Sequence, residues 1–175
     1  EKFGYKQVWK EKTANYLVGL GFNEIFTNSI TNAAYFSEED LQGTVKLLNN
    51  LSADHNIMRP SMLETGLEAI AYNLNRKNQD LRFFEYGKTY ATSGSGQYSE
   101  KDHLCFYITG DTQKNSWKSK SVPADFFYLK GVVNSIFQLA GLSKTTAEAF
   151  SNSKLHDGLR ISIGKTQIAE IGTVN

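Results

Sequence analysis

The feature that most constrains the fold is the stretch from Asn49 to Tyr90, where a helical pattern gives way directly to a strand pattern. Ser61 stands three residues before Glu64, which is the spacing of a capping box. We expect the Ser61 hydroxyl to accept from the Glu64 N–H while the carboxylate reaches back to the Ser61 N–H. Apolar residues then recur at helical spacing: Leu63, Leu67, Ile70, Ala71 and Leu74. Cations at 76 and 77 end the helix, and the aromatic run 81–90 predicts a strand.

The remaining elements combine helices with hairpins. A helix is predicted over residues 5–20 with Gly21 as its left-handed cap, and another over 126–139, capped by Asp125 and ended by Gly141. Further strands are predicted over residues 22–30, 103–110, 145–150, 159–163 and 167–174, and residues 45–51 are predicted to be a short strand or extended segment. Because no regular βαβ alternation occurs, we expect an α+β fold with a mainly antiparallel sheet flanked by helices. The length suits a single domain over residues 1–175.

The connections carry their own signals. Thr31 and Asn32 restart a short helix, and residues 37–40 form an acidic helical turn. The Ser/Gly-rich stretch 92–102 is predicted to be the flexible loop of a hairpin, and 111–123 a second polar loop. Gly164-Lys165 has the Gly-X form of a type II′ hairpin turn.

Composition excludes several classes. A formal net charge of +1 gives no general attraction to nucleic acid or membrane. The single Cys105 rules out an internal disulfide framework and suits a reducing, cytoplasmic setting. No apolar run approaches the roughly 20 residues of a membrane span. Both ends look like cuts through a longer protein.

Candidate chemical motifs are weak. Gly164-Lys165-Thr166 ends like a phosphate-binding loop, but Leu159 stands where that loop needs glycine, so a hairpin turn is favoured. His103 and Cys105 share one strand face, yet zinc needs more ligands than these two. The alternative to a metal site is a histidine near a strand end and a buried thiol. Glu64, Glu68 and Glu85 fall on caps, a helix face and a strand, which does not favour general acid–base chemistry.

The densest basic group is Arg76, Lys77, Arg82 and Lys88. It can touch phosphate, but a solvated face, or an ion pair with Asp80 or Glu85, is the favoured interpretation. The aromatic side chains at positions 83, 84, 86 and 90 can stack on bases. Aromatics on both faces of a strand more often indicate burial on both sides.

The segment 58–90, MRPSMLETGLEAIAYNLNRKNQDLRFFEYGKTY, closely resembles bacterial phenylalanyl-tRNA synthetase β subunits, which carry MRPSLLPGLL, NLNRKN and LRLFEIGKVF at these places. Residues 20–25 (LGFNEI) and 125–131 (DFFYLKG) resemble the family's GFNEI and DFFDLKG. The likeness departs at Asn50, where proline is usual, and at 155–160, which only loosely follows an HPGR-like turn.

This resemblance implies a class II aminoacyl-tRNA synthetase-like module excised from a longer multidomain β chain. It implies an (αβ)₂ enzyme in the cytoplasm that uses ATP and Mg²⁺ to charge tRNA-Phe with phenylalanine. The α subunit carries the active site, and this fragment by itself holds no catalytic residue, cofactor or metal. On this basis the helix 5–20 and the strand after it are expected to pack on the α subunit through Trp9, Tyr16 and Phe26.

The resemblance also places Arg82 and Glu85 on a strand like the second class II motif, where an arginine holds the α-phosphate of ATP by charge neutralisation. The family's partner arginine from a late Gly-rich strand has no counterpart in residues 168–174 (IAEIGTV). We therefore predict a degenerate site, with the fold retained and the chemistry lost. Two alternatives stay open: an independent class II-type adenylating enzyme and a stand-alone RNA-binding module.

Overall fold

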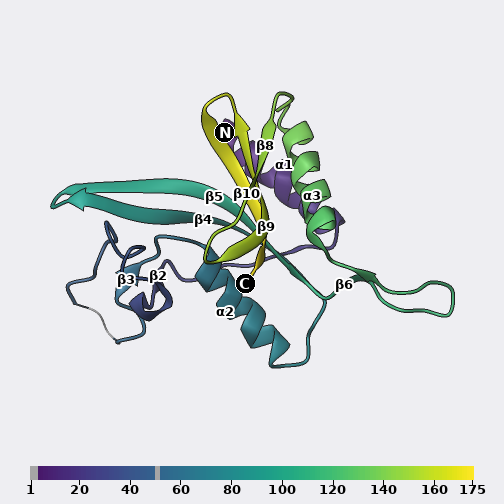
Figure 1. Cartoon of the computed structure of the whole chain (residues 1–175), viewed down its shortest axis with the longest axis horizontal. Coiled ribbons are helices and arrows are strands. Elements are labelled where there is room, and N and C mark those ends of the chain that lie inside the picture. Colours follow the sequence, from purple (N-terminus) through teal and green to yellow (C-terminus); the bar gives the residue numbers. More distant parts are fainter. Residues whose placement is uncertain (1–3, 50–51) are drawn as a thin grey trace. The chain divides into compact units, whose positions relative to one another are not determined.

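The computed structural model describes residues 4–49 and 52–175 and divides into two compact units (Figure 1). One contains residues 14–107, and the other combines the N-terminal segment up to Thr13 with residues 108–175. The helix α1 (Tyr5–Gly19) runs through both. It ends as predicted, because Gly21 takes a φ of 81° and its N–H donates to the Val18 carbonyl. The single domain predicted over residues 1–175 stays a prediction.

In the unit 14–107, the sheet has the order β1-β4-β5. β1 (Asn23–Glu24) pairs parallel with β4 (Leu81–Gly94), and β4 turns into β5 (Gln97–Thr109). A small antiparallel pair, β2 (Ile30–Thr31) and β3 (Ile57–Met58), lies beside the 3-10 helix η1 (Ala33–Tyr35). The helix α2 (Leu63–Leu74) precedes β4, so the predicted helix followed by a strand is confirmed.

The core of this unit lies on both faces of β4. On one face Leu81 and Phe83 cluster with Ile70 of α2 and Tyr107 of β5. On the other face Phe84 is fully buried, and its ring meets Tyr86 edge-on. The predicted burial of the aromatic strand on both sides is confirmed, because side chains at alternate positions of a strand face opposite ways.

The unit that contains residues 108–175 has an antiparallel sheet of order β10-β9-β8, shown with α3 in Figure 1. Its elements are α3 (Phe126–Leu139), β8 (Thr146–Phe150), β9 (Leu155–Ile163) and β10 (Thr166–Val174). Asp125 caps α3 as predicted, since its Oδ1 accepts from the Tyr128 N–H at 2.8 Å. Gly164, with a φ of 59°, turns β9 into β10. No helix in the described part of the chain is long and apolar enough to cross a membrane.

Several local predictions are wrong. The Ser61 hydroxyl accepts from the Leu63 N–H at 3.0 Å instead of that of Glu64, so the N-cap is Met62 and α2 begins at Leu63, one residue later than a Ser61 cap predicts. The strand predicted over 22–30 is interrupted between β1 and β2. The reason is that the Thr27 N–H turns to the Glu85 carboxylate, and the Asn28 side chain accepts from the Ile30 N–H.

Two predicted loops contain strands. Most of 92–102 belongs to β4 and β5, which are joined only by residues 95 and 96. Cross-strand contacts between Lys88 and Glu100, and between Thr89 and His103, pair the two arms. The loop 111–123 contains the strands β6 (Asp111–Gln113) and β7 (Val122–Pro123). Of the strand predicted over 45–51, only a bridge from Lys46 to Ile57 forms, and residues 50 and 51 lie outside the described residues.

Candidate functional site

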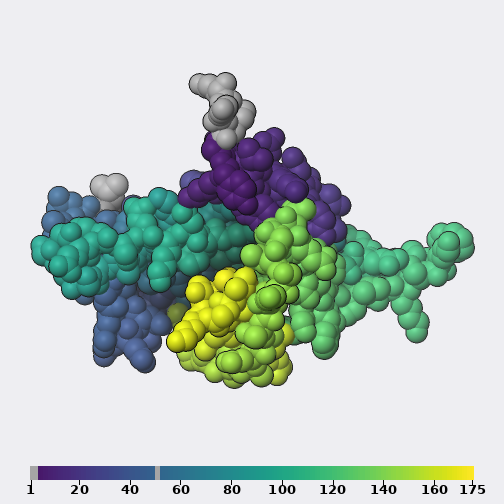
Figure 2. Space-filling view, turned by 90° about the horizontal axis from the view of Figure 1, so that it is seen from above, coloured from purple at the N-terminus to yellow at the C-terminus, as the bar shows by residue number. Residues whose placement is uncertain are grey.

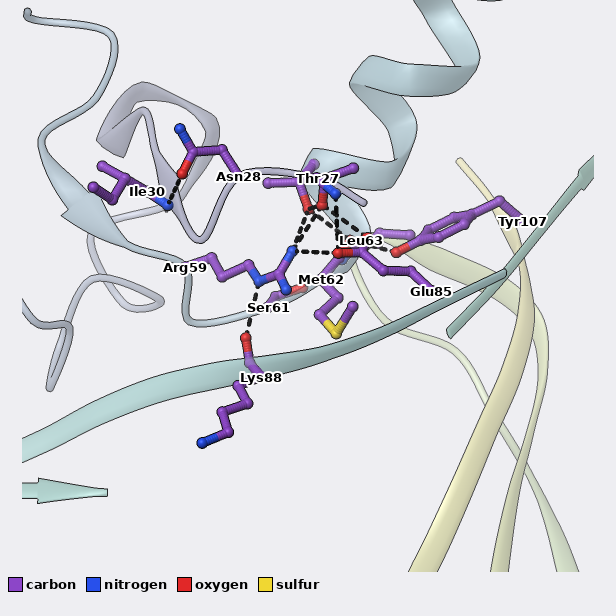
Figure 3. A network of polar contacts seen from close by, with 11 residues as sticks. Thr27, Asn28, Ile30, Arg59, Ser61, Met62, Leu63, Glu85, Lys88 and Tyr107 are labelled. Atoms are coloured by element: carbon purple, nitrogen blue, oxygen red, sulfur yellow. Dashed lines mark hydrogen bonds and ion pairs between the residues drawn. The ribbon is translucent and has the colours of Figure 1, made fainter. Parts of the chain in front are cut away.

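The most buried charged groups in the described residues are an arginine and a glutamate on neighbouring elements (Figure 3). The Arg59 Nη1 lies 3.1 Å from the Glu85 Oε1, and the two side chains are 2% and 0% exposed. Arg59 directly follows β3, and Glu85 lies in the middle of β4. Two charges so fully removed from water are stable only when further hydrogen bonds satisfy the rest of their polar atoms.

Threonines and main-chain groups supply those hydrogen bonds. The Glu85 carboxylate accepts from the Thr27 N–H at 3.1 Å and from the Thr27 hydroxyl at 2.8 Å. Arg59 donates through Nη1 to the Thr27 Oγ1 at 2.7 Å and through Nε to the Lys88 carbonyl at 2.9 Å. The Thr65 hydroxyl of α2 lies 3.4 Å from the same Nη1. The network joins four segments of the chain into one buried polar cluster.

The arginine reaches Glu85 across a gap in β4 that glycine provides. Glu85 and Gly87 lie on the same face of the strand. A Cβ atom added at Gly87 would stand 2.3 Å from the Arg59 Nη2 and 2.4 Å from the Met62 Cε. No larger residue fits beneath the guanidinium without displacing it.

A second contact of the same kind fixes the start of α2. The Tyr107 ring lies against Gly66, where an added Cβ would stand 2.0 Å from the ring. The Tyr107 hydroxyl donates to the Met62 carbonyl at 2.6 Å. Burial raises the pKa of Tyr107, and it raises the pKa of the neighbouring Cys105 thiol to about 11. Both groups are therefore neutral near pH 7 and form part of the core.

Sequence reasoning missed Arg59. Among the alternatives left open for the basic group at 76, 77, 82 and 88, the ion pair with Glu85 is wrong, because Glu85 pairs with Arg59. The pair with Arg59 spans 26 residues, and no local spacing connects the two positions. The one available signal was an arginine between the apolar residues 57–58 and Pro60, a place where an exposed charge is unexpected.

Arg82, the motif-2-like arginine, contacts the end of α1. Its Nη1 lies 3.3 Å from the Leu20 carbonyl, which belongs to the turn that closes the helix. A cation at this position suits the negative end of the helix dipole. The Arg82 guanidinium also lies against Gly21, with 3.4 Å between its Cζ and an added Cβ. Arg82 and Glu85 are thus on one strand but in two separate sets of contacts.

The other basic residues of the predicted group are dispersed. Arg76 stacks on the Tyr72 ring at 3.4 Å and donates to the Tyr72 carbonyl. Lys77 takes a left-handed conformation with a φ of 65° just after α2. Lys88 pairs with Glu100 across the hairpin. The structure does not gather these four residues into one site.

The predicted interface residues differ in exposure. Trp9 and Tyr16 are half-buried and lie two helical turns apart on α1, so they share a face. Tyr5 and Val8 lie on the same face and are 85% and 51% exposed. Phe26 follows β1 and is 93% exposed.

The remaining candidate motifs are part of ordinary secondary structure. Gly164-Lys165-Thr166 lies at the β9–β10 turn. The His103 Nε2 lies 2.8 Å from the Thr89 hydroxyl, while Cys105 packs against the core. Among residues 4–49 and 52–175, no three His, Cys, Asp or Glu side chains lie together as a metal site requires.

Comparisons with known proteins place this geometry in a family. The family model described as "Phenylalanyl tRNA synthetase beta chain CLM domain" matches residues 2–175. A Phenylalanine--tRNA ligase beta subunit from Bacteroides fragilis is 44% identical over 74% of this chain and 17% of its own length. The corresponding subunit from Staphylococcus haemolyticus is 33% identical over 90% of this chain and 20% of its own length. The chain thus spans about a fifth of the length of these curated relatives.

Solved structures agree on the fold. A pyrrolysyl-tRNA synthetase from Desulfitobacterium hafniense superposes with a TM-score of 0.67 at 20% identity, covering 95% of this chain and 55% of that one. An ATP phosphoribosyltransferase regulatory subunit/histidyl-tRNA synthetase from Bacillus halodurans gives a TM-score of 0.57 at 16% identity, covering 84% of this chain and 38% of that one. The predicted α+β, class II synthetase-like fold is confirmed. Together with the family match over nearly its whole length, this shows that the chain belongs to the CLM domain family of phenylalanyl-tRNA synthetase beta chains.

Proposed function

We propose that this domain is a non-catalytic structural partner of the catalytic α subunit within a cytoplasmic phenylalanine–tRNA ligase. In this proposal the holoenzyme binds ATP and Mg²⁺, activates phenylalanine and charges tRNA-Phe. The β chain supplies the class II fold that holds the α subunit in place. Family membership supports the setting, and the contacts of the motif-2-like strand support the non-catalytic role.

The observation that carries the proposal is that Arg82 and Glu85 both contact other groups of the domain. A phosphate-binding arginine must present its guanidinium to an open site, whereas Arg82 donates to the end of α1. Glu85 is fully buried and has its carboxylate oxygens occupied by Arg59 and Thr27. The residues present do not fit ATP on this strand. We therefore assign no step of the reaction to them.

Kinetics of the assembled enzyme test the assignment. The Arg82→Met variant of the full β chain, assembled with the α subunit, is expected to keep the KM for ATP and the kcat of aminoacylation within about twofold. The matched control is Arg160→Met, which removes an arginine paired with Glu170 on the sheet of the other unit. Removing a group that stabilises the transferred phosphate typically costs about 100-fold or more in rate. A loss of that size confined to Arg82→Met would contradict the proposal.

The same strand argues against an independent adenylating enzyme. That alternative needs ATP–pyrophosphate exchange by the β chain without the α subunit, and we expect none above background. A stand-alone RNA-binding module built on Arg76, Lys77 and Arg82 is also not favoured, because Arg76 stacks on Tyr72 of α2 whereas Arg82 contacts the end of α1.

The contact with the α subunit is assigned to α1 and to the segment after β1. Trp9, Tyr16 and Phe26 remain the proposed interface residues. Support comes from the exposed apolar side chains around them, since a soluble chain gains nothing from leaving Phe26 and Tyr5 in water. Aromatic residues are also enriched among those that carry the binding energy of interfaces.

A further inference from the structure

The segment between β6 and β7 carries a tryptophan that the fold does not use. Trp117 is 97% exposed and lies in the connection 114–121 of the small hairpin. Figure 2 shows this hairpin, in green, projecting as a narrow extension from the surface. Burying a large apolar side chain is worth roughly 1.5–3 kcal/mol, and the fold gains none of this from Trp117.

The tip of the hairpin is held by hydrogen bonds on both sides of the tryptophan. The Ser116 N–H donates to the Ser119 carbonyl at 2.9 Å, and the Ser116 Oγ accepts from the Ser119 N–H at 3.2 Å. The Lys118 N–H donates to the same Oγ at 3.3 Å. Gln113 at the end of β6 donates to the Ser119 hydroxyl at 2.7 Å. Trp117 therefore lies in a turn that these hydrogen bonds stabilise.

The hairpin is basic although the whole chain is nearly neutral. Residues 111–123 contain Lys114, Lys118 and Lys120 against the single acidic residue Asp111, which gives a formal charge of +2. The formal charge of the whole chain is only +1. The hairpin is thus a local positive patch of the kind that a near-neutral protein needs to contact polyanions.

One exposed aromatic ring beside several cations fits a single-stranded nucleic acid, because any base can stack on the ring while lysines meet the neighbouring phosphates. A membrane anchor needs more apolar surface than one indole among serines and an asparagine. We propose that the hairpin 111–123 binds an unpaired stretch of RNA, with Trp117 stacking on a base and Lys118 and Lys120 contacting phosphates. The choice of RNA over DNA rests on the proposed function in a tRNA-charging enzyme, whereas the stacking and charge arguments do not.

The test uses the full β chain assembled with the α subunit. The probe is an oligouridylate of about 12 nucleotides, within the site sizes of single-strand binders, followed by fluorescence anisotropy. Trp117→Ala is expected to weaken binding about tenfold, since stacking contributes about 1–3 kcal/mol per base. The matched control is Tyr98→Ala, which removes a 66% exposed aromatic from the β4–β5 hairpin and is expected to change nothing. Binding within twofold of wild type for Trp117→Ala would overturn the proposal.

The lysines are tested by salt dependence. The double variant Lys118→Ala/Lys120→Ala is expected to lower the slope of log K against log salt by about 1.4, because each phosphate contact on a single strand contributes about 0.7. An unchanged slope would overturn their assignment to phosphate.

Photocrosslinking gives a readout confined to this site. A 4-thiouridine-containing probe is expected to label the tryptic peptide 115–118, and the absence of that product would overturn the proposal. Two further measurements distinguish RNA from DNA and from a membrane surface as the ligand. A tenfold preference for the matching oligodeoxythymidylate would overturn the RNA assignment, and Trp117-dependent binding to anionic vesicles in place of RNA would favour a membrane. Failure of the proposed function would appear as no assembly with the α subunit in the wild-type chain and in every variant alike, before any RNA is added.

Discussion

At the residue scale, Arg59 and Glu85 form a pair whose net contribution to stability is small but whose disruption is costly. Each charge gives up its hydration, and the attraction between them only repays that cost when the remaining donors and acceptors are satisfied. The Thr27 and Lys88 contacts meet this condition. Such a pair ties the segments at 27, 59, 65 and 85 to one arrangement, so its main effect is on which structure forms.

We expect Glu85→Gln to lower the free energy of unfolding of the domain by about 3–5 kcal/mol, because it leaves the Arg59 guanidinium buried without a counter-ion. Urea denaturation followed by circular dichroism measures this change. The control is Glu100→Gln, which breaks the solvent-exposed pair with Lys88 and is expected to have a much smaller effect. Equal effects of the two substitutions would show that burial of the Arg59–Glu85 pair does not increase the loss of unfolding free energy.

At the element scale, β4 works as a divider between two sets of contacts. One face carries Leu81, Phe83, Glu85 and Gly87 toward α2 and Arg59. The other carries Arg82 toward the end of α1, and Phe84. The alternation of side chains along a strand enforces this division. Glycine at 87 weakens the strand locally, but it provides the space through which Arg59 reaches its partner.

Two glycine-to-alanine substitutions should change the stability of the domain in opposite directions. Gly87→Ala places a methyl group within 2.4 Å of the Arg59 and Met62 side chains and is expected to destabilise the domain by about 1–3 kcal/mol. Gly131 lies inside α3 with nothing within 4 Å of an added Cβ, so Gly131→Ala should stabilise it by about 0.5–1 kcal/mol. Thermal melts of both variants compare them directly. A neutral or stabilising Gly87→Ala would contradict the close packing of Arg59 over β4.

At the scale of the whole molecule, the exposed apolar residues indicate what the chain is built to meet. Tyr5, Val8 and Phe26 are 85%, 51% and 93% exposed. Scattered exposed apolar residues are common, but Tyr5 and Val8 form a short row one turn apart on α1, and such a row is a feature of interfaces. This row supports the proposed contact with the α subunit.

We expect Phe26→Glu in the full β chain to reduce recovery of the α subunit in a pull-down about tenfold or more, because a charge replaces an exposed aromatic anchor. The double variant Trp9→Glu/Tyr16→Glu should abolish assembly. Since both residues are half-buried, circular dichroism must show that this variant still folds. Tyr98→Glu, on the β4–β5 hairpin, is the matched control and should assemble normally. Undiminished assembly of Phe26→Glu and of the folded double variant would contradict the interface.

The elements that could be predicted are those whose cause is local. The helix that ends at Gly19, the Asp125 cap and the turn at Gly164 depend on periodicity, a capping side chain and a positive φ within a few residues. The motif-like residues Arg82 and Glu85 were also visible, because the segment 58–90 resembles the family. The contacts that these two residues make were not visible in the sequence, since the partners considered for Glu85 were its basic neighbours in sequence.

The sequence by itself determined the order of the three helices and of the long strands, the mainly antiparallel character of the fold and the membership suggested by residues 58–90. Only the tertiary structure decided that Arg59 is the partner of Glu85, that Arg82 closes α1 and that the strand after Phe22 breaks at Thr27. The Thr27–Glu85 bond spans 58 residues, and the Arg59–Glu85 bond spans 26. The physical reason is that a buried charge takes the nearest partner in space. That partner is set by how the segments pack and not by their spacing along the chain.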